Sequence, residues 1–163
     1  MGKLQALASN DNSGHPTDRR IGFEADIQCL PMYVKRTLDR LALKIGRAQW
    51  SAMTDQERLA IGHVSTECKA DCANAQELVR GILRGYGTEP VLLPASVERS
   101  ADPPAEVPAA VTESALEVGF IVDQEEWSKL DTDQRYALTK LIGSGKRNKR
   151  KRALIEFLTE RSE

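Results

Sequence analysis

The chain has 163 residues, of which 23 are basic and 24 are acidic, so its formal net charge is −1. This length is enough to bury a core in one domain, and the balanced charge excludes a general attraction to nucleic acid or anionic membranes. Aromatic residues make up only 5% of the chain, so Leu, Ile, Val and Ala must supply most of the core.

The sequence also indicates a compartment. No apolar run reaches the roughly 18 residues of a membrane helix, and the first residues become polar too early for a signal peptide. The three cysteines are an odd number, which is typical of reduced thiols. We therefore expect a cytoplasmic protein with no membrane contact.

Residues 1–21 are mostly polar and show no apolar period, which predicts a disordered N-terminal tail. Residues 22–161 are expected to form one helical domain, interrupted by an internal loop at 88–108. Five of the seven prolines fall in that loop, so it should be extended rather than helical. Its apolar residues 91–93 are expected to dock onto the body of the domain.

The first helix should begin at Pro31, because proline is tolerated in the first turn of a helix. Val34, Leu38 and Leu41 follow at the spacing of one apolar stripe. Residues 43–45 then alternate like a short strand.

Capping patterns place the next elements of the first half. A helical turn is expected over 47–53. Thr54 and Glu57 have the spacing of a capping box, which predicts a helix over 55–64. A further helix should start near Asp71 and end at Gly85.

The second half contains similar signals. A short helix is expected from Pro108 to Gly119, and a second brief strand over 120–122 that could pair with the first. Asp123 and Asp131 are expected to cap two helices, because Glu126 lies three positions after the first and Gln134 three positions after the second. A final helix should carry Leu154, Phe157 and Leu158 on one face. The predicted fold class is mainly α, with two similar helical corners and a short two-stranded β element.

One short pattern occurs twice, beginning at Trp50 and at Trp127, and an Arg follows eight positions later in each copy, Arg58 and Arg135. We interpret the tryptophans as core anchors that build the scaffold twice, although a pair of exposed aromatic platforms would give the same pattern. Each arginine should have a structural role, either in a salt bridge and stem packing or by binding carbonyls of the opposite half.

Residues that often bind metals or act as nucleophiles are present but poorly arranged. Cys68 and Cys72 share a helical face and His63 is nearby, yet a closed zinc site needs four ligands and no fourth stands close. Cys29 lacks a histidine base in a recognisable motif. We therefore expect no metal, no cofactor, no catalytic residue and no enzyme activity.

Residues 146–152 form the strongest charge cluster, with six cations in seven positions. Cations at the start of a helix oppose its dipole, so this placement favours an anionic partner. RNA, DNA and an acidic protein surface remain alternatives at this point.

Several motifs resemble the nitrate reductase associated protein family, over roughly residues 22–160. The matching segments, in chain order, are Phe23-Glu24-Ala25-Asp26, Cys29-Leu30-Pro31-Met32-x-Val34-Lys35-x-x-Leu38-Asp39, Leu43-Lys44-Ile45 to Trp50, Glu126-Trp127-x-x-Leu130-x-x-x-x-Arg135-Tyr136-Ala137-Leu138-x-Lys140-Leu141, and Ala153-Leu154-x-Glu156-Phe157. The resemblance implies association with assimilatory nitrate reductase, and some members are described as maturation factors for that molybdenum enzyme. It implies no catalytic residue and no cofactor.

The sequence as a whole favours a non-catalytic accessory or maturation factor that contacts nitrate reductase or its apoenzyme. The alternative is a nucleic-acid-binding or regulatory module that uses residues 146–152. The predicted partner-binding residues are Glu24, Asp26, Cys29, Lys35, Arg36, Lys146, Arg147, Lys149 and Arg150.

Overall fold

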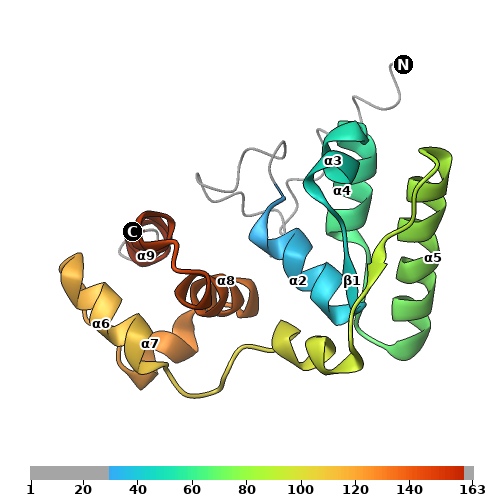
Figure 1. Ribbon diagram of the computed structural model, residues 1–163. Helices are drawn as coiled ribbons and strands as arrows, with labels where there is room; N and C mark the ends of the chain where they lie inside the picture. Colours follow the sequence, from blue (N-terminus) through green and yellow to red (C-terminus); the bar gives the residue numbers. More distant parts are fainter. Residues whose placement is uncertain (1–29, 160–163) are drawn as a thin grey trace, which may run out of the picture.

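The computed structural model describes residues 30–159, which fold into two groups of helices joined side by side (Figure 1). The predicted tail over 1–21 and the candidate residues Glu24, Asp26 and Cys29 lie outside the described residues. We call residues 30–102 the N-terminal half and residues 103–159 the C-terminal half.

The described elements confirm the predicted fold class, a mainly helical fold with a small two-stranded sheet. The N-terminal half contains α2 (Met32–Arg40), β1 (Leu43–Lys44), α3 (Arg47–Ala52), α4 (Asp55–His63), α5 (Lys69–Gly85), β2 (Val91–Leu92) and the 3₁₀ helix η2 (Ala95–Ala101). The C-terminal half contains α6 (Ala109–Glu117), α7 (Gln124–Lys129), α8 (Thr132–Gly143) and α9 (Arg147–Thr159).

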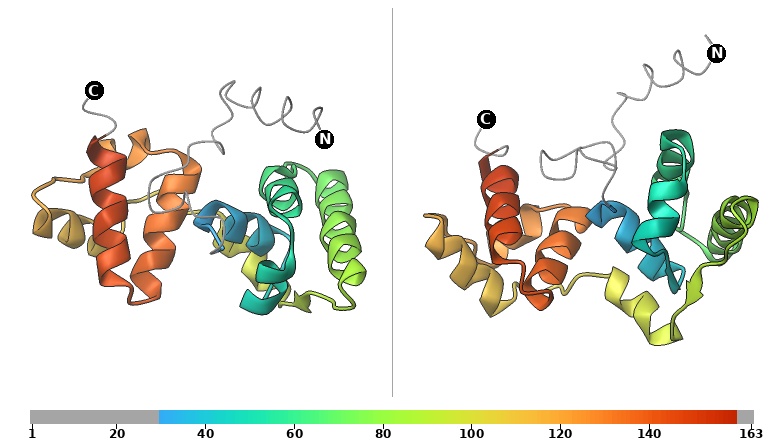
Figure 2. Two further views of the ribbon diagram at one scale, coloured as in Figure 1. Left: turned by 90° about the horizontal axis from the view of Figure 1, so that it is seen from above. Right: turned by 45° about the horizontal axis from the view of Figure 1, so that its top comes forward.

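Each half has its own apolar cluster, and α2 contributes to both. Val34 and Leu38 of α2 are buried in the cluster of the N-terminal half, beside Trp50. Met32, at the start of the same helix, packs in the cluster of the C-terminal half with Trp127. The views in Figure 2 show α2 lying between the two groups of helices. This helix therefore connects the two cores.

The predicted start of α2 is confirmed. Pro31 is the N-cap residue, with φ −66°, and the stripe of Val34, Leu38 and Leu41 is buried. After the helix, Ala42 takes a positive φ of 52°, a left-handed backbone conformation that residues other than glycine seldom adopt. This residue turns the chain from α2 into β1.

The predicted pairing of residues 43–45 with residues 120–122 is wrong. β1 pairs instead with β2, antiparallel, with Leu43 opposite Leu92. Residues 120–122 form no strand because local bonds hold them against the end of α6: the Phe120 amide donates to the Ala115 carbonyl, and Thr112 donates to the Val122 carbonyl. Some of the backbone hydrogen-bonding groups of residues 120–122 are thus already bonded locally and are not free to pair with a strand.

The expectation of an extended loop at 88–108 is wrong for residues 95–101, which form η2 and pack against α2. Docking of residues 91–93 is confirmed for the backbone, because the Leu93 amide also donates to the Ala42 carbonyl. The side chains of Val91 and Leu92 nevertheless remain exposed.

The two helical corners have matching local structure. α3 and α7 are six-residue helices, each followed by a longer helix with a capping box. Thr54 and Glu57 exchange their predicted bonds at the start of α4, and Asp131 and Gln134 do so at the start of α8. Because these caps need only residues three apart, they form wherever the sequence places them.

Candidate functional site

Both tryptophans lie in the apolar cores, where Trp50 is 2% exposed and Trp127 is fully buried. The Trp127 indole N–H donates to the Pro104 carbonyl at 3.0 Å, which ties α7 to the connection between the halves. With so little exposed ring surface, neither side chain offers an aromatic platform to a partner.

The two arginines of the repeated pattern behave differently. Arg58 is 4% exposed and donates to the carbonyls of Trp50 and Ser51, both at 3.0 Å, and to the Asp55 carboxylate at 2.9 Å. The hypothesis that it binds the opposite half is therefore wrong, because these carbonyls belong to the preceding helix of its own half. Arg135 has a buried Nε that finds no hydrogen-bond partner among residues 30–159.

A buried carboxylate joins the two halves. Asp39 of α2 is 5% exposed and accepts hydrogen bonds from Tyr136 at 2.7 Å and Ser100 at 3.3 Å. Lys140 forms an ion pair with the same carboxylate at 3.1 Å. These partners come from α8 and η2, so one side chain fixes three elements in relation to one another.

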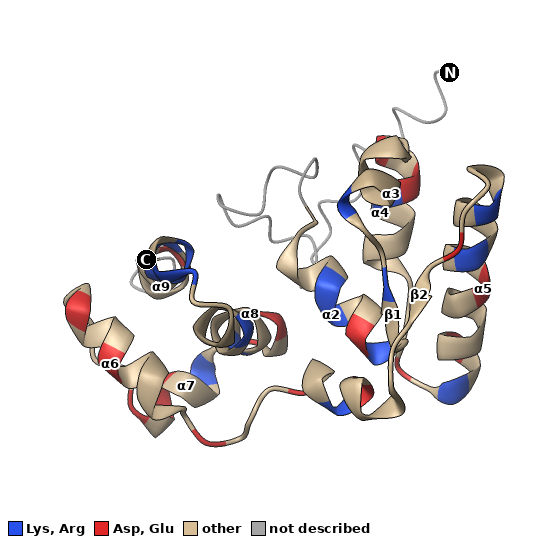
Figure 3. Ribbon diagram, in the orientation of Figure 1, with Lys and Arg blue, Asp and Glu red and all other residues tan. Residues whose placement is uncertain are grey.

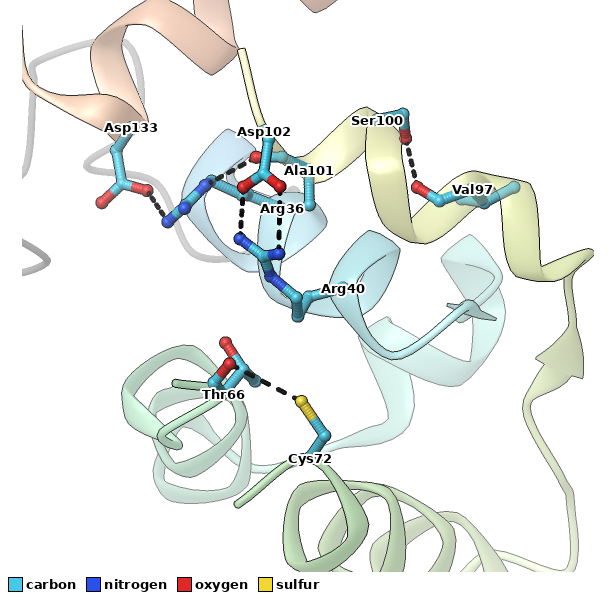
Figure 4. Close-up of polar contacts among 9 residues, drawn as sticks. All are labelled: Arg36, Arg40, Thr66, Cys72, Val97, Ser100, Ala101, Asp102 and Asp133. Atoms are coloured by element: carbon cyan, nitrogen blue, oxygen red, sulfur yellow. Dashed lines mark hydrogen bonds and ion pairs between the residues drawn. The ribbon is translucent and has the colours of Figure 1, made fainter. Parts of the chain in front are cut away.

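Two arginines extend this bridge along α2 (Figure 4). Arg36 donates to the Ala101 carbonyl at 2.9 Å and to Asp133 of α8 at 3.1 Å, and Arg40 pairs with Asp102 just after η2. Burial raises the pKa of Asp133 above its ordinary value, and the neighbouring Arg36 guanidinium opposes that rise. Arg36, predicted as a partner-binding residue, is thus engaged within the fold.

A cleft of about 680 Å³ opens beside this bridge, where α2, α3, α8 and the start of α9 meet. Its walls combine apolar and cationic side chains, and no acidic residue lines them among residues 30–159. The lining residues are Leu30, Met32, Lys35, Ile45, Gly46, Arg47, Trp50, Thr139, Lys140, Leu141, Gly143, Ser144, Lys146 and Lys149. Figure 3 marks the basic residues of α2, α8 and α9 in blue.

The cations of the cleft differ in whether a carboxylate neutralises them. Lys140 pairs with Asp39. Lys35, Arg47 and Lys146 are exposed and form no ion pair with any residue between 30 and 159. Within the described part of the chain, the cleft therefore carries positive charge from both halves that no carboxylate compensates.

The basic run at 146–152 divides between two surroundings. Lys146 and Lys149 line the cleft, whereas Arg147 and Lys151 pair with Glu117 of α6 at 2.8 and 3.1 Å. The hydrogen bond from Arg147 is the main reason why the pKa of Glu117 falls below its ordinary value. Arg150 is half-buried, with a buried Nε that makes no hydrogen bond to the described residues. Of the predicted partner-binding residues that the structure describes, it brings together Lys35, Lys146 and Lys149.

Sequence reasoning missed two other cations of this cleft. Arg47 lies at the start of α3 and Lys140 lies in α8, far apart in the sequence, and no spacing rule connects them. The only available signal for Arg47 is that it directly follows Gly46, which comes after the strand predicted over 43–45.

Cys68 and Cys72 have local roles at the start of the helix that follows α4. Cys68 is the N-cap residue of α5, and its sulfur accepts from the Asp71 amide, so this helix begins two residues before the predicted Asp71. The Cys72 thiol donates to the Thr66 carbonyl at 3.6 Å, and burial is the main cause that raises its pKa. Within residues 30–159, no three His, Cys, Asp or Glu side chains are grouped so that they could hold a metal ion.

None of the helices between residues 30 and 159 combines the length and apolar character needed to cross a membrane. A family model described as conserved nitrate reductase-associated protein matches residues 21–157 of the chain. No curated protein and no solved structure matches the chain significantly.

Proposed function

The chain belongs to the conserved nitrate reductase-associated protein family, and we propose on this basis that it is a non-catalytic accessory protein that contacts nitrate reductase or its apoenzyme. The family name indicates association with that enzyme. A role in maturation, before the enzyme is complete, is the form of association that we favour.

The observation that carries the proposal of direct contact is the cleft between the halves. Lys35 and Arg47 from the N-terminal half and Lys146 from the C-terminal half line it, and none of the three forms an ion pair with a carboxylate among residues 30–159. Complementary charge speeds encounter and selects partners. Asp39 holds both walls in place through Tyr136, so the surface is preformed.

The alternative, nucleic-acid binding through residues 146–152, receives less support. Glu117 neutralises part of that run, whereas nucleic-acid affinity rises with the number of cations that reach phosphates. Single-stranded nucleic acid also needs aromatic side chains on which bases stack, and the one aromatic residue lining the cleft, Trp50, is 2% exposed.

Capture of purified nitrate reductase tests the proposal. The immobilised protein should retain the enzyme, with the apoenzyme retained at least as well as the complete form, at roughly micromolar concentration. Capture of neither form would refute direct contact. Nitrate reductase activity should be unchanged when the accessory protein is added to the complete enzyme. If the added protein itself catalysed turnover that the enzyme alone does not show, the non-catalytic role would be refuted.

A further inference from the structure

We propose that the cleft between the halves binds an extended acidic segment of the partner protein, with an apolar side chain placed between its carboxylates. This inference rests on the proposed function, because it specifies the chemistry of the surface that the contact would use. It commits to a peptide ligand rather than to a nucleic acid or a small anion.

The composition of the cleft supports a ligand that is both acidic and apolar. Three apolar side chains line the cleft beside the cations: Leu30 is half-buried, whereas Met32 and Ile45 are 7% and 5% exposed. A ligand of charges alone would leave the accessible part of this apolar lining, mainly Leu30, uncovered. A volume of about 680 Å³ falls within the roughly 300–1,000 Å³ of ligand sites that enclose most of their ligand. The cleft can therefore hold a few residues of an extended chain.

The spread of the charges favours an extended ligand over a compact anion. Lys35 lies on α2, Arg47 on α3 and Lys146 just before α9, so three separate segments of the chain carry the cations. A phosphate or carboxylate ion is bound tightly when several donors converge on it, as in a bidentate arginine pair. Carboxylates spaced along a peptide match separated point charges better.

Two triple variants, each of which loses three positive charges, distinguish binding in the cleft from binding elsewhere on the surface. The cleft variant carries Lys35→Gln, Arg47→Gln and Lys146→Gln. The control variant carries Lys44→Gln, Lys69→Gln and Arg152→Gln. All six side chains are exposed, and those of the control variant do not line the cleft. Both variants should therefore fold, which circular dichroism verifies.

The probe is a short fluorescein-labelled peptide in which Glu alternates with Ser and Leu, measured by fluorescence anisotropy. We expect the cleft variant to bind it about 10-fold or more weakly than the wild type, since each lost ion pair contributes a modest amount. The control variant should stay within about twofold of the wild type. Replacing Glu by Gln, or Leu by Ser, in the peptide should also weaken binding.

Four results would overturn the inference, and three of them concern the variants and the probes. These three are equal weakening by both variants, tighter binding of an oligothymidine or of inorganic phosphate than of the peptide, and no measurable peptide binding. A fourth concerns this chain's own acidic residues: if Glu24→Gln with Asp26→Asn tightens peptide binding about 10-fold, the chain itself competes for the cleft and the partner assignment fails.

The same variants distinguish this inference from the proposed function. If nitrate reductase is captured equally by the wild type and the cleft variant, the proposed function stands and the assignment of the cleft fails. If the peptide binds as expected but nitrate reductase is not captured, the cleft assignment keeps its chemistry and the proposed partner is wrong.

Discussion

The hydroxyl of Tyr136 donates a hydrogen bond of 2.7 Å to the carboxylate of Asp39, across 97 positions of the sequence. Both residues are almost fully buried, so the bond joins the two halves where water does not compete. The cleft lies beside this contact, and its geometry depends on the same elements.

Removing that hydroxyl should weaken the whole fold. We expect Tyr136→Phe to lower the free energy of unfolding by about 1–3 kcal/mol, because a buried carboxylate loses a hydrogen-bond donor. Urea unfolding measures the change. Tyr86→Phe is the matched control, since Tyr86 also donates to a carboxylate, that of Glu57, but is exposed; an effect as large as that of Tyr136→Phe would contradict this account.

The two arginines of the repeated pattern should differ in their contribution to stability. Arg58→Met removes the bonds to two backbone carbonyls and should cost about 2–3 kcal/mol. Arg135→Met should cost clearly less, because its buried Nε has no partner among the described residues. Thermal and urea unfolding of both variants tests this. Equal losses would mean that the two corners are energetically equivalent.

Two glycines should respond to alanine with opposite signs. A Cβ at Gly62 would lie 2.8 Å from Cε2 of Tyr33, so Gly62→Ala should cost about 1–3 kcal/mol through overpacking between α4 and α2. A Cβ at Gly81, within α5, meets nothing within 4 Å. Gly81→Ala should therefore add about 0.5–1 kcal/mol through helix propensity. Chemical denaturation gives both signs.

Asp133 should make stability depend on pH in an unusual direction for an acid. Burial raises its pKa in the folded chain, so the folded state holds the proton more tightly than the unfolded state does. The favourable contribution of Asp133 to the free energy of unfolding is therefore complete below the pKa of the unfolded state, about 3.9. It is lost as the pH rises through the pKa of the folded state.

The variant Asp133→Asn isolates this contribution. The free energy of unfolding of the variant, relative to the wild type, should increase as the pH rises from about 3.5 to about 6. Urea unfolding at several pH values measures the difference. A relative decrease over that range would show that the ion pair with Arg36 outweighs burial, because the folded pKa would then be depressed.

Local signals explain which parts of the fold could be predicted from the sequence. The cap formed by Thr54 and Glu57 needs only neighbouring residues, as does the apolar stripe of α2. Strand pairing needs more: Leu43 has Leu92 as its partner, and a brief apolar run alone does not specify which segment it meets. The prolines at 88–108 correctly predicted a break between helices, but a 3₁₀ helix forms there because α2 offers η2 a surface to pack on.

The candidate site was predictable only residue by residue. Lys35 stood out beside a helix start and Lys146 within a basic run, yet only the folded chain shows that they share a cleft. Arg36 has the same charge and adjoins Lys35, but it points to Asp133 and Ala101 instead. Neighbouring residues on a helix point about 100° apart. Composition and charge alone do not show which of the two faces the cleft.

The long separation between Asp39 and Tyr136 also matters during synthesis on the ribosome. The separation of 97 positions takes about 5–20 s to translate at about 5–20 residues per second. During that interval the face of α2 that carries Met32 and Asp39 has no partner from the C-terminal half. The nascent chain thus exposes a core-forming face of α2 until α8 emerges from the ribosome. Packing of the C-terminal half against α2 then covers this face and removes it as a site of aggregation.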